Sequence, residues 1–255
     1  MLSHLLTIYA ISDIYNIASY GRFSTFMKDR VNDPHLTMLS GDFISPSNYT
    51  SIDDGKTMMN VIANSNIDYI SLGNHEFDIK KSDLEQRLSE NSHSTFISSN
   101  LKFKHTISYD IYEVDNLKIG IIGLVTNEEE YNPEIKVLDP IVSTLELIHL
   151  FKDVDYLIAM THQDIEFDYK LIDSVNVYGG KKIDVILGGH IHTASLLTYK
   201  DVPIIRTGEN LEYVGVIELS KNEMNIEMIE ANNLAIDPYF VTLKENADNE
   251  LKKNF

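Results

Sequence analysis

The first third of the chain contains three apolar segments, each followed within a few residues by a loop that carries an aspartate or an asparagine. The apolar segments are residues 5–11, 35–39 and 67–72, and amphipathic segments at 17–31 and 55–63 separate them. Short apolar runs that alternate with segments of helical periodicity are typical of the strands and helices of α/β proteins. Because such folds bind ligands at the carboxyl ends of their strands, the polar loops predict a binding crevice.

The third of these loops has the highest density of chemically useful side chains in the chain. Residues 71–78 read Ser-Leu-Gly-Asn-His-Glu-Phe-Asp, so an amide, an imidazole and two carboxylates surround a glycine turn. Side chains in this arrangement can converge on a bound phosphate and its metal ions. The loop is therefore the first place to look for a reactive site.

The rest of the chain continues the pattern and adds antiparallel features. Asp115-Asn116 between two strand-like segments predicts a hairpin, and Ser143-Thr144-Leu145-Glu146 has the form of a capping box that starts a helix running through Phe151. A helix is also expected at 82–89, and strands at 94–98, 106–114, 117–124, 155–160, 183–187, 202–205, 213–219 and 224–229, the last three in a second sheet. We therefore predict an α/β fold with an α+β-like, four-layer arrangement, in which two mixed β-sheets pack face to face with flanking helices.

Length and composition predict one large globular domain. The chain has 255 residues, 43% hydrophobic and 24% charged, which is enough for a substantial core. We assign residues 1–235 to one main domain and residues 236–255 to a helical or frayed C-terminal tail. The acidic segment 127–131 is expected to be a solvated surface loop.

Charge and cysteine content exclude several kinds of function. The 39 acidic residues outnumber the 21 basic ones, so the protein repels polyanions and duplex nucleic acid is not an expected partner. The absence of cysteine excludes disulfides, thiolate nucleophiles and cysteine metal sites. The apolar N-terminus lacks a basic flank and a cleavage site, and no run is long enough to span a bilayer, so we expect a cytoplasmic protein with no membrane partner.

Candidate metal ligands recur at the ends of five predicted strands. A single aspartate after a strand is usually a turn or capping residue, but the two imidazoles of the Gly-His-x-His segment at 189–192 rarely serve packing. Carboxylate, amide and imidazole ligands together suit divalent ions such as Mn, Zn, Fe, Co or Ni, with Mg also open. The candidates are Asp13, Asp42, Asn74, His162, His190 and His192, with Tyr15 beside the first.

Five motifs in this order resemble those of the calcineurin-like metallophosphoesterases, and within them the 5'-nucleotidase branch. The motifs are Asp13-x-Tyr15, Gly41-Asp42-x-x-Ser45, Gly73-Asn74-His75-Glu76, Thr161-His162 and Gly189-His190-x-His192. The resemblance covers nearly all of the chain and implies the catalytic domain alone. The C-terminal domain that holds the nucleobase in that branch is not expected in this sequence, so nucleoside specificity is not inherited with the motifs.

The resemblance also implies a role for each candidate residue. One metal ion would be held by Asp13, Asp42 and His192, and a second by Asp42, Asn74, His162 and His190, with Asp42 as the bridge. Two such ions clamp a phosphate and supply hydroxide from a bound water. His75 would contact the phosphate or protonate the leaving oxygen, with Asp78 orienting its ring. Glu76 is expected to be structural.

Tyr15 departs from the pattern, because most of the superfamily has histidine at this position. A neutral phenol is a poor ligand, so we expect Tyr15 to bind weakly or to lie behind the ligands, which would leave the first ion more exchangeable. The expected function is hydrolysis of a small phosphate monoester, above all a nucleotide. The alternatives are a phosphodiesterase for cyclic nucleotides or nucleotide diphosphate compounds, and a catalytically silent metal-binding relative.

Overall fold

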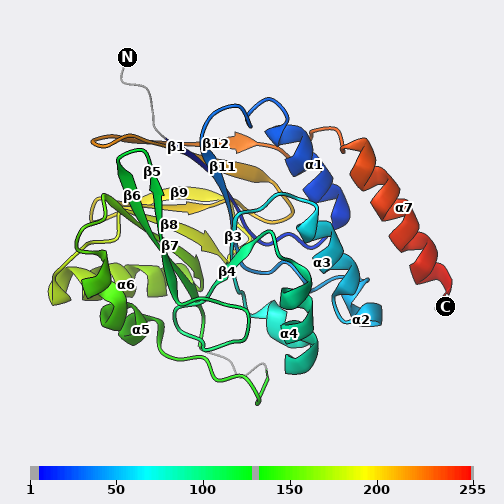
Figure 1. Ribbon diagram of the computed structural model, residues 1–255, viewed down its shortest axis with the longest axis horizontal. Coiled ribbons are helices and arrows are strands. Elements are labelled where there is room, and N and C mark those ends of the chain that lie inside the picture. The colour runs from blue at the N-terminus through cyan, green and yellow to red at the C-terminus, as the bar shows by residue number, and fades with distance from the viewer. Residues whose placement is uncertain (1–5, 128–131, 254–255) are drawn as a thin grey trace.

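Two mixed six-stranded sheets pack face to face in the computed structural model, with helices on both outer sides (Figure 1). The structure describes residues 6–127 and 132–253. This four-layer architecture confirms the fold class predicted from the sequence. The acidic segment predicted to be a surface loop falls largely on residues 128–131, which lie outside the described residues.

The first sheet has a parallel centre made by the N-terminal strands. β1, β2, β3 and β4 run parallel to one another, while β11 pairs antiparallel with β1 and β12 pairs antiparallel with β11. The spatial order is β12-β11-β1-β2-β3-β4. The strands are β1 (Leu6–Ile11), β2 (His35–Ser40), β3 (Tyr69–Ser71), β4 (Thr95–Ile97), β11 (Tyr213–Leu219) and β12 (Met224–Glu230).

The second sheet also has a parallel centre, formed by β6, β7, β8 and β10. β5 and β6 form the antiparallel hairpin that Asp115-Asn116 predicts, and β9 adds an antiparallel edge to β10. The spatial order is β5-β6-β7-β8-β10-β9. The strands are β5 (Tyr109–Val114), β6 (Leu117–Val125), β7 (Tyr156–His162), β8 (Val185–Gly189), β9 (Ser195–Tyr199) and β10 (Val202–Arg206).

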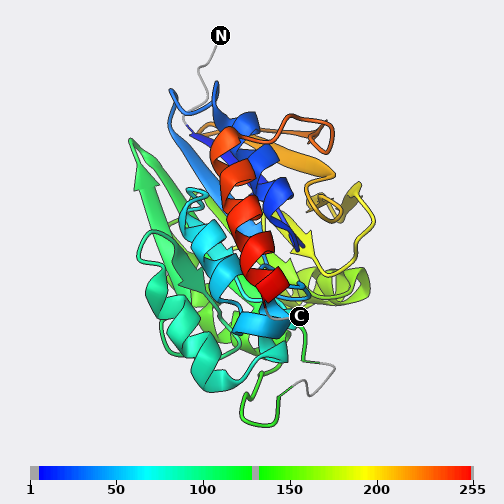
Figure 2. The ribbon, with the colours of Figure 1, turned by 90° about the vertical axis from the view of Figure 1, so that its right-hand side faces the viewer.

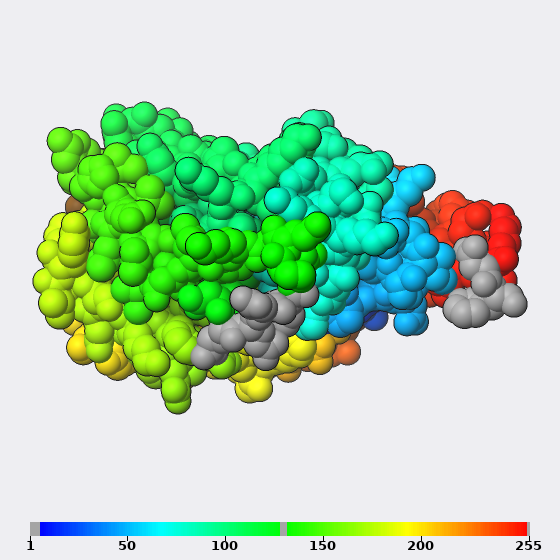
Figure 3. Space-filling model, turned by 90° about the horizontal axis from the view of Figure 1, so that it is seen from below, coloured from blue at the N-terminus to red at the C-terminus, as the bar shows by residue number. Residues whose placement is uncertain are grey.

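The helices cover the two outer faces separately. Helices α1, α3, α4 and α7 lie on the side of the first sheet, and α5 and α6 on the side of the second (Figure 1). α7 runs beside α1 and α3 and forms one end of the molecule (Figures 2 and 3). The helices are α1 (Ile17–Met27), α2 (Thr50–Asp53), α3 (Lys56–Ala63), α4 (Lys81–Glu90), α5 (Pro140–Leu147), α6 (Ile165–Tyr178) and α7 (Pro238–Lys253), with short 3-10 helices η1 (His75–Asp78) and η2 (Ile148–Phe151).

The alternating direction of the side chains along each strand explains why both faces of the sheets are covered. In β1, Leu6, Ile8 and Ala10 point into the core between the sheets, while Tyr9 and Ile11 point to the core under the helices. Side chains with a period of two must divide between the two faces of a sheet in this way. Both faces of the central strands are therefore buried, which is why these segments read as continuous apolar runs.

Several boundaries and pairings differ from the predictions. The second-sheet assignment of segments 213–219 and 224–229 is wrong, because β11 and β12 extend the first sheet through β1. The capping-box start is also wrong: α5 begins at Pro140, where Asp139 accepts a bond from the Val142 amide. Proline in the first turn, preceded by a capping aspartate, is the stronger start signal.

Other differences follow from burial. α1 ends at Met27 rather than at residue 31, since Val31 is 53% exposed and offers no packing beyond that point. The elements α2, η1, α6 and the edge strand β9 were not expected from the sequence; Leu196 and Leu197 of β9 are exposed. The C-terminal segment, predicted to be helical or frayed, forms α7. Among the described residues, no helix is both long and apolar enough to cross a membrane.

Candidate metal centre

Five loops meet where the parallel strands of the two sheets end. Asp13, Asp42 and Asn74 follow the adjacent strands β1, β2 and β3 of the first sheet. His162 is the last residue of β7, and His190 follows the neighbouring strand β8 of the second sheet. The carboxyl ends of neighbouring parallel strands lie at one edge, so residues far apart in the chain converge.

The backbone at three of these residues adopts an uncommon conformation. Asp13, Asp42 and His190 have φ values of 55°, 56° and 75°. Positive φ costs energy in residues other than glycine and recurs at functional sites, where the surrounding structure holds it in place. The loops thus turn sharply at three of the six predicted ligands.

The tightest group consists of Asp13, Asp42 and His162. One ligand atom from each lies within 4.8 Å of the others, and all three side chains are buried. Asp13 Oδ2 is buried without a hydrogen-bond partner, and His162 Nε2, which also lacks a hydrogen bond, lies 3.2 Å from Asp42 Oδ1 as an ion pair. Buried polar atoms are normally paired, so this unsatisfied set has the chemistry and spacing of a divalent cation site.

The ring of His162 is oriented for metal binding by a contact across the two sheets. Its Nδ1 lies 2.8 Å from the carbonyl oxygen of Ser40, at the end of β2. Donation to that carbonyl leaves Nε2 as the nitrogen directed at the carboxylates, a common arrangement for ligating histidines. Burial alone would lower the pKa of His162, but the Asp42 and Asp13 carboxylates raise it to about 9.

Two glycines leave the room that this group needs. A Cβ atom on Gly73 would collide with Asp42 Oδ1 and would lie 2.9 Å from His162 Nε2. A Cβ atom on Gly189 would lie 2.6 Å from His162 Nδ1 and 3.1 Å from Asp13 Oδ2. A side chain at either position would fill the space between the candidate ligands. The glycines of the two motifs therefore allow the ligand side chains to lie close to the backbone of these loops.

Asn74 and His190 form a second part of the cluster. His190 Nδ1 lies 3.0 Å from Asn74 Oδ1, and the His190 and His162 rings meet edge to face at a centroid distance of 5.3 Å. The His190 amide also donates to Asp13 Oδ1 at 3.1 Å. Burial and the nearby His162 charge lower the pKa of His190, which favours the neutral imidazole that binds metals.

His192 and Tyr15 complete the cluster on its more open side. His192 Nε2 lies 3.7 Å from Asp13 Oδ1 and 2.8 Å from the Tyr15 hydroxyl, which itself donates to Asp42 Oδ2 at 3.0 Å. Burial and the charges of Asp42 and Asp13 raise the pKa of Tyr15 above its ordinary value. The structure therefore brings all six predicted ligands and Tyr15 together.

His75 and Asp78 form a separate pair beside the cluster, in the 3-10 helix η1. His75 Nδ1 lies 2.9 Å from Asp78 Oδ2, and Ser45 donates to the same oxygen at 2.6 Å. Because Nδ1 contacts Asp78, Nε2 of the partly exposed His75 ring is the nitrogen that can contact a bound ligand. Partial burial would lower the pKa of His75, but the Asp42 and Asp78 carboxylates raise it, which suits a group that donates a proton.

Glu76, between these two residues, joins the second and third loops. Its buried carboxylate accepts bonds from the amides of Asp42, Phe43, Ile44 and Gly73. Burial and the Asp42 charge nevertheless raise the pKa of Glu76 to about 7. The side chain is fully occupied by backbone donors, which fits the structural role expected for it.

Asn210 contributes to the site without having been singled out in the sequence. Its amide donates to the Asp13 carbonyl at 2.8 Å, and its side-chain oxygen accepts from the Tyr15 amide at 3.1 Å. Its backbone φ is 51°. Asparagine is favoured at positive φ, but a single asparagine in a loop is too common to be a signal by itself.

Carboxylates also lie around the open side of the cluster. Asp164 Oδ1 is 3.9 Å from His190 Nε2, and Glu209 Oε2 is 3.7 Å from His192 Nδ1. Both carboxylates are about half exposed, so they face any molecule that approaches the two histidines from solvent. A hollow of about 480 Å³ adjoins this side and is lined by His192, Ser195, Glu212, Tyr213 and Met228, among others.

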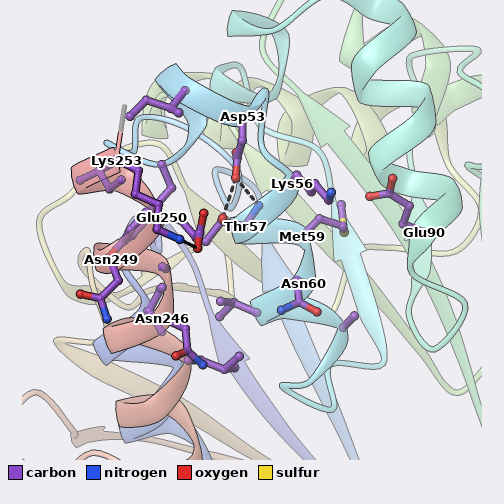
Figure 4. A pocket seen from close by; sticks show the side chains of 18 residues that line it. Asp53, Lys56, Thr57, Met59, Asn60, Glu90, Asn246, Asn249, Glu250 and Lys253 are labelled. Atoms are coloured by element: carbon purple, nitrogen blue, oxygen red, sulfur yellow. Dashed lines mark hydrogen bonds and ion pairs between the residues drawn. The ribbon is translucent and has the colours of Figure 1, made fainter. Parts of the chain in front are cut away.

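A larger cavity, of about 1030 Å³, lies apart from these residues. It opens between α2, α3 and α7, and Figure 4 shows Asp53, Lys56 and Glu250 among its lining side chains. None of the candidate metal ligands lines it. Its size therefore says nothing about the chemistry of the metal centre.

The fold and the histidine–carboxylate cluster together define the metallophosphoesterase type of protein. Residues 6–194 match the family model described as calcineurin-like phosphoesterase. The chain therefore belongs to the calcineurin-like phosphoesterase family. The resemblance inferred from the five motifs is confirmed.

Curated relatives are 5'-nucleotidases of greater length. The snake venom 5'-nucleotidase of Gloydius brevicauda is 27% identical over 184 residues, 64% of this chain and 30% of that protein. The NAD 5'-nucleotidase of Haemophilus influenzae is 28% identical over 170 residues, 62% of this chain and 27% of that protein. The matched regions thus span less than a third of the length of these relatives.

Solved structures share the fold. A 5'-nucleotidase precursor from Thermus thermophilus superposes with a TM-score of 0.80 at 18% identity, over 97% of this chain and 59% of that one. A calcineurin-like phosphoesterase from Bacillus subtilis superposes with a TM-score of 0.77 at 18% identity, over 98% of both chains. At this identity the likeness establishes the architecture, and function has to be argued from the site.

Proposed function

We propose that this chain is a metal-dependent phosphoesterase that hydrolyses small phosphate monoesters, with nucleotides as the leading substrate class. One observation carries the proposal: Asp13 Oδ2 is buried without a hydrogen-bond partner in a carboxylate–imidazole cluster, where His162 Nε2 faces Asp42 Oδ1 at 3.2 Å, next to the His75–Asp78 pair. A divalent cation bound among these carboxylates would supply the partner that Asp13 Oδ2 lacks. The pair beside it has the composition of a general acid and its orienting group.

The residues divide into two sets of ligands that share one carboxylate. Asp13, Asp42 and His192 would hold one ion, and Asn74, His162 and His190 would hold the second together with Asp42. Two ions held in this way supply positive charge for the phosphate oxygens and acidify a water molecule. Mn, Zn, Fe, Co, Ni and Mg are all compatible with this mixed donor set.

The protein's own groups then orient the substrate and move the proton. His75 Nε2 is the atom that would donate a hydrogen bond or a proton to the leaving oxygen. Asp78 keeps the ring in place through Nδ1, and Ser45 holds Asp78 from the other side. Glu76 fixes the loop that carries Asp42 against the loop that carries His75.

The carboxylates on the open side favour a substrate with a single phosphate. A leaving group with further phosphates would meet Asp164 and Glu209, which are about half exposed beside His190 and His192. Like charges at short range disfavour binding by amounts that depend on screening by salt. We therefore place monophosphates ahead of nucleotide diphosphate compounds, and the relatives that are 5'-nucleotidases support a nucleoside as the leaving group.

A metal-reconstitution assay tests the proposal. Protein stripped by a chelator is reloaded with Mn, Zn, Ni or Mg and tested against p-nitrophenyl phosphate, bis-p-nitrophenyl phosphate, AMP, ADP and NAD. We expect metal-dependent release of phosphate, fastest from AMP, and slow turnover of ADP. Preference for the bis ester would favour the phosphodiesterase alternative, and no metal-dependent hydrolysis of any substrate would favour the silent relative.

A further inference from the structure

A buried ion pair lies behind the metal centre, and its arginine is in a part of the chain that the family model does not cover. Arg206 is the last residue of β10, and its side chain is 1% exposed. Its Nη2 lies 2.5 Å from Oδ2 of Asp168, a fully buried residue of α6. The family model ends at residue 194, so neither the five motifs nor that match assigns a role to Arg206.

The same guanidinium group also bonds the backbone of two ligand-bearing loops. Nη1 donates to the carbonyl of Gly189, the residue before His190. Nη2 donates at 2.9 Å to the carbonyl of Gln163, the residue after His162. One side chain thus connects the ends of the neighbouring strands β7 and β8, where two candidate ligands of the second ion are found.

Asp168 and its neighbours hold the guanidinium in this position. Asp168 Oδ2 pairs with Arg206, while Asp168 Oδ1 accepts a bond of 3.0 Å from the side chain of Gln163. Gly188, which pairs with Arg206 across the sheet, leaves the space the group occupies, since a Cβ there would lie 3.0 Å from Arg206 Cζ. The planar guanidinium can satisfy several acceptors at once, which an ammonium group does less well.

A role in packing alone explains this arrangement poorly. Burying a charge is costly, and an apolar pair of similar size often stabilises a core as well or better. Two of the acceptors of Arg206 are carbonyls next to His162 and His190, where a shift of the loop would move an imidazole. The ligand side chains themselves are bonded elsewhere, to Ser40 and Asn74, so Arg206 acts on them through the backbone.

We propose that Arg206, held by Asp168, is a positioning residue that fixes the separation of His162 and His190 for metal binding. This inference rests on the proposed function, because it assumes that these histidines hold an ion. It predicts that loss of the guanidinium loosens the metal site while the protein remains folded. Outer partners of metal ligands typically change metal affinity by about 10- to 100-fold.

The experiment compares Arg206→Met with the control Arg87→Met. Arg87 is a second largely buried arginine, 8% exposed, and it is paired with Glu90 in α4 rather than with a ligand loop. For each metal-stripped protein we measure Tm, the affinity for Mn²⁺ by calorimetry, and the visible spectrum after loading with Co²⁺. We expect both variants to lose Tm, but only Arg206→Met to lose at least tenfold in Mn²⁺ affinity and to shift the cobalt bands.

Two further variants separate positioning from stability. Asp168→Asn keeps the arginine but weakens its support, and it should lower Mn²⁺ affinity even if Arg206→Met does not fold. The double variant Arg206→Met, Asp168→Leu replaces the ion pair by apolar groups, and should regain Tm without regaining affinity. Recovery of both quantities in the double variant, or unchanged affinity and cobalt bands in Asp168→Asn, would overturn the proposal.

Metal binding is measured independently of hydrolysis, so the two proposals fail separately. A wild-type protein that binds Mn²⁺ but hydrolyses nothing would reject the proposed function, while a tenfold loss of affinity in Arg206→Met would still support the positioning role. If the wild-type protein hydrolyses AMP but Arg206→Met keeps the wild-type Mn²⁺ affinity and cobalt spectrum, the proposed function would be supported and the positioning role of Arg206 would be rejected.

Discussion

The hydroxyl of Tyr15 lies 2.8 Å from Nε2 of His192, and their rings meet edge to face at a centroid distance of 5.6 Å. The same hydroxyl lies 3.0 Å from Asp42 and 3.3 Å from Asp13. One phenol oxygen therefore contacts all three side chains proposed to hold the first ion. We therefore expect the occupancy of the first metal position to depend on Tyr15.

We predict that the wild-type protein binds one ion tightly and one weakly. The neutral phenol is a poor ligand, and burial among carboxylates raises its pKa further. Tyr15→His supplies an imidazole and should increase the tightly bound metal from about one ion to about two, as measured by elemental analysis after gel filtration. Tyr15→Phe, which keeps the ring contact with His192, is the control and should stay at one. Two tightly bound ions in wild type and Tyr15→His alike would contradict the weak-site prediction.

His75→Ala should lower turnover without removing metal. A positioned general acid typically contributes about 10²- to 10⁴-fold to a rate. The His75 ring makes its side-chain bond to Asp78 rather than to the ligand cluster, so metal content should be unchanged. Steady-state kinetics with p-nitrophenyl phosphate, whose leaving group needs little protonation, should show a smaller loss than kinetics with AMP. Equal losses on both substrates would count against a proton-donating role.

Glu76→Gln should destabilise the protein even when metal is absent. The Glu76 carboxylate accepts four backbone amide bonds, whereas a glutamine side chain presents one acceptor oxygen and turns an NH₂ group toward amide donors. Unpaired buried donors cost about 1–3 kcal/mol each, so we expect a loss of about 3 kcal/mol in the free energy of unfolding. Urea denaturation of the metal-stripped wild type and variant measures this loss.

The control for Glu76 is Glu113→Gln, on the exposed hairpin of β5 and β6. Glu113 pairs with Lys118 at 2.9 Å, but both side chains are about half exposed. Removing such a pair should change stability by less than about 1 kcal/mol. A Glu76→Gln variant as stable as this control would show that the four amide bonds contribute little.

Asp237 should make the attachment of α7 depend on pH. The Tyr239 amide donates to its carboxylate at 2.9 Å and Lys28 of the segment after α1 lies at 3.0 Å, and together they lower the pKa of Asp237. A carboxyl group with a lowered folded-state pKa stabilises fully above its unfolded value near 3.9, and loses this contribution as the pH falls through the folded value.

The variant Asp237→Asn keeps an N-capping side chain but removes the charge. We expect it to be about 0.5–1 kcal/mol less stable than wild type at pH 7, with the difference shrinking below about pH 4. Thermal unfolding of both stripped proteins from pH 7 to pH 3 provides the comparison. A difference that stays constant or grows toward acid pH would show that the charge of Asp237 is not the cause.

Much of the site could be predicted because each part of it is a local pattern. Asp13, Asp42 and Asn74 stand directly after apolar runs, and the ends of parallel strands meet at one edge whatever the rest of the chain does. The Gly-His-x-His segment can also be recognised from the sequence, because it too is a local pattern. The sequence therefore predicts all six candidate ligands, and the structure brings them together.

The pairing of β-strands that lie far apart in the chain was harder to predict from the sequence. β11 and β12 were expected in the second sheet, but strand neighbours depend on which apolar faces meet after the chain has folded, and β11 joins β1 at residues more than 200 positions away. β9 is an exposed edge, so it lacks the alternation that marks a strand. α6 carries a buried aspartate, Asp168, where periodicity would call for an apolar residue.

The sequence by itself determined the family, the α/β class and the identity of the metal-binding candidates, because these depend on short motifs and on periodicity along the chain. Only the tertiary structure decided how they are held. The four amide bonds of Glu76 and the bridge from Arg206 to two ligand loops join residues up to 43 positions apart. Such contacts depend on the direction of side chains in a packed core, which no local pattern specifies.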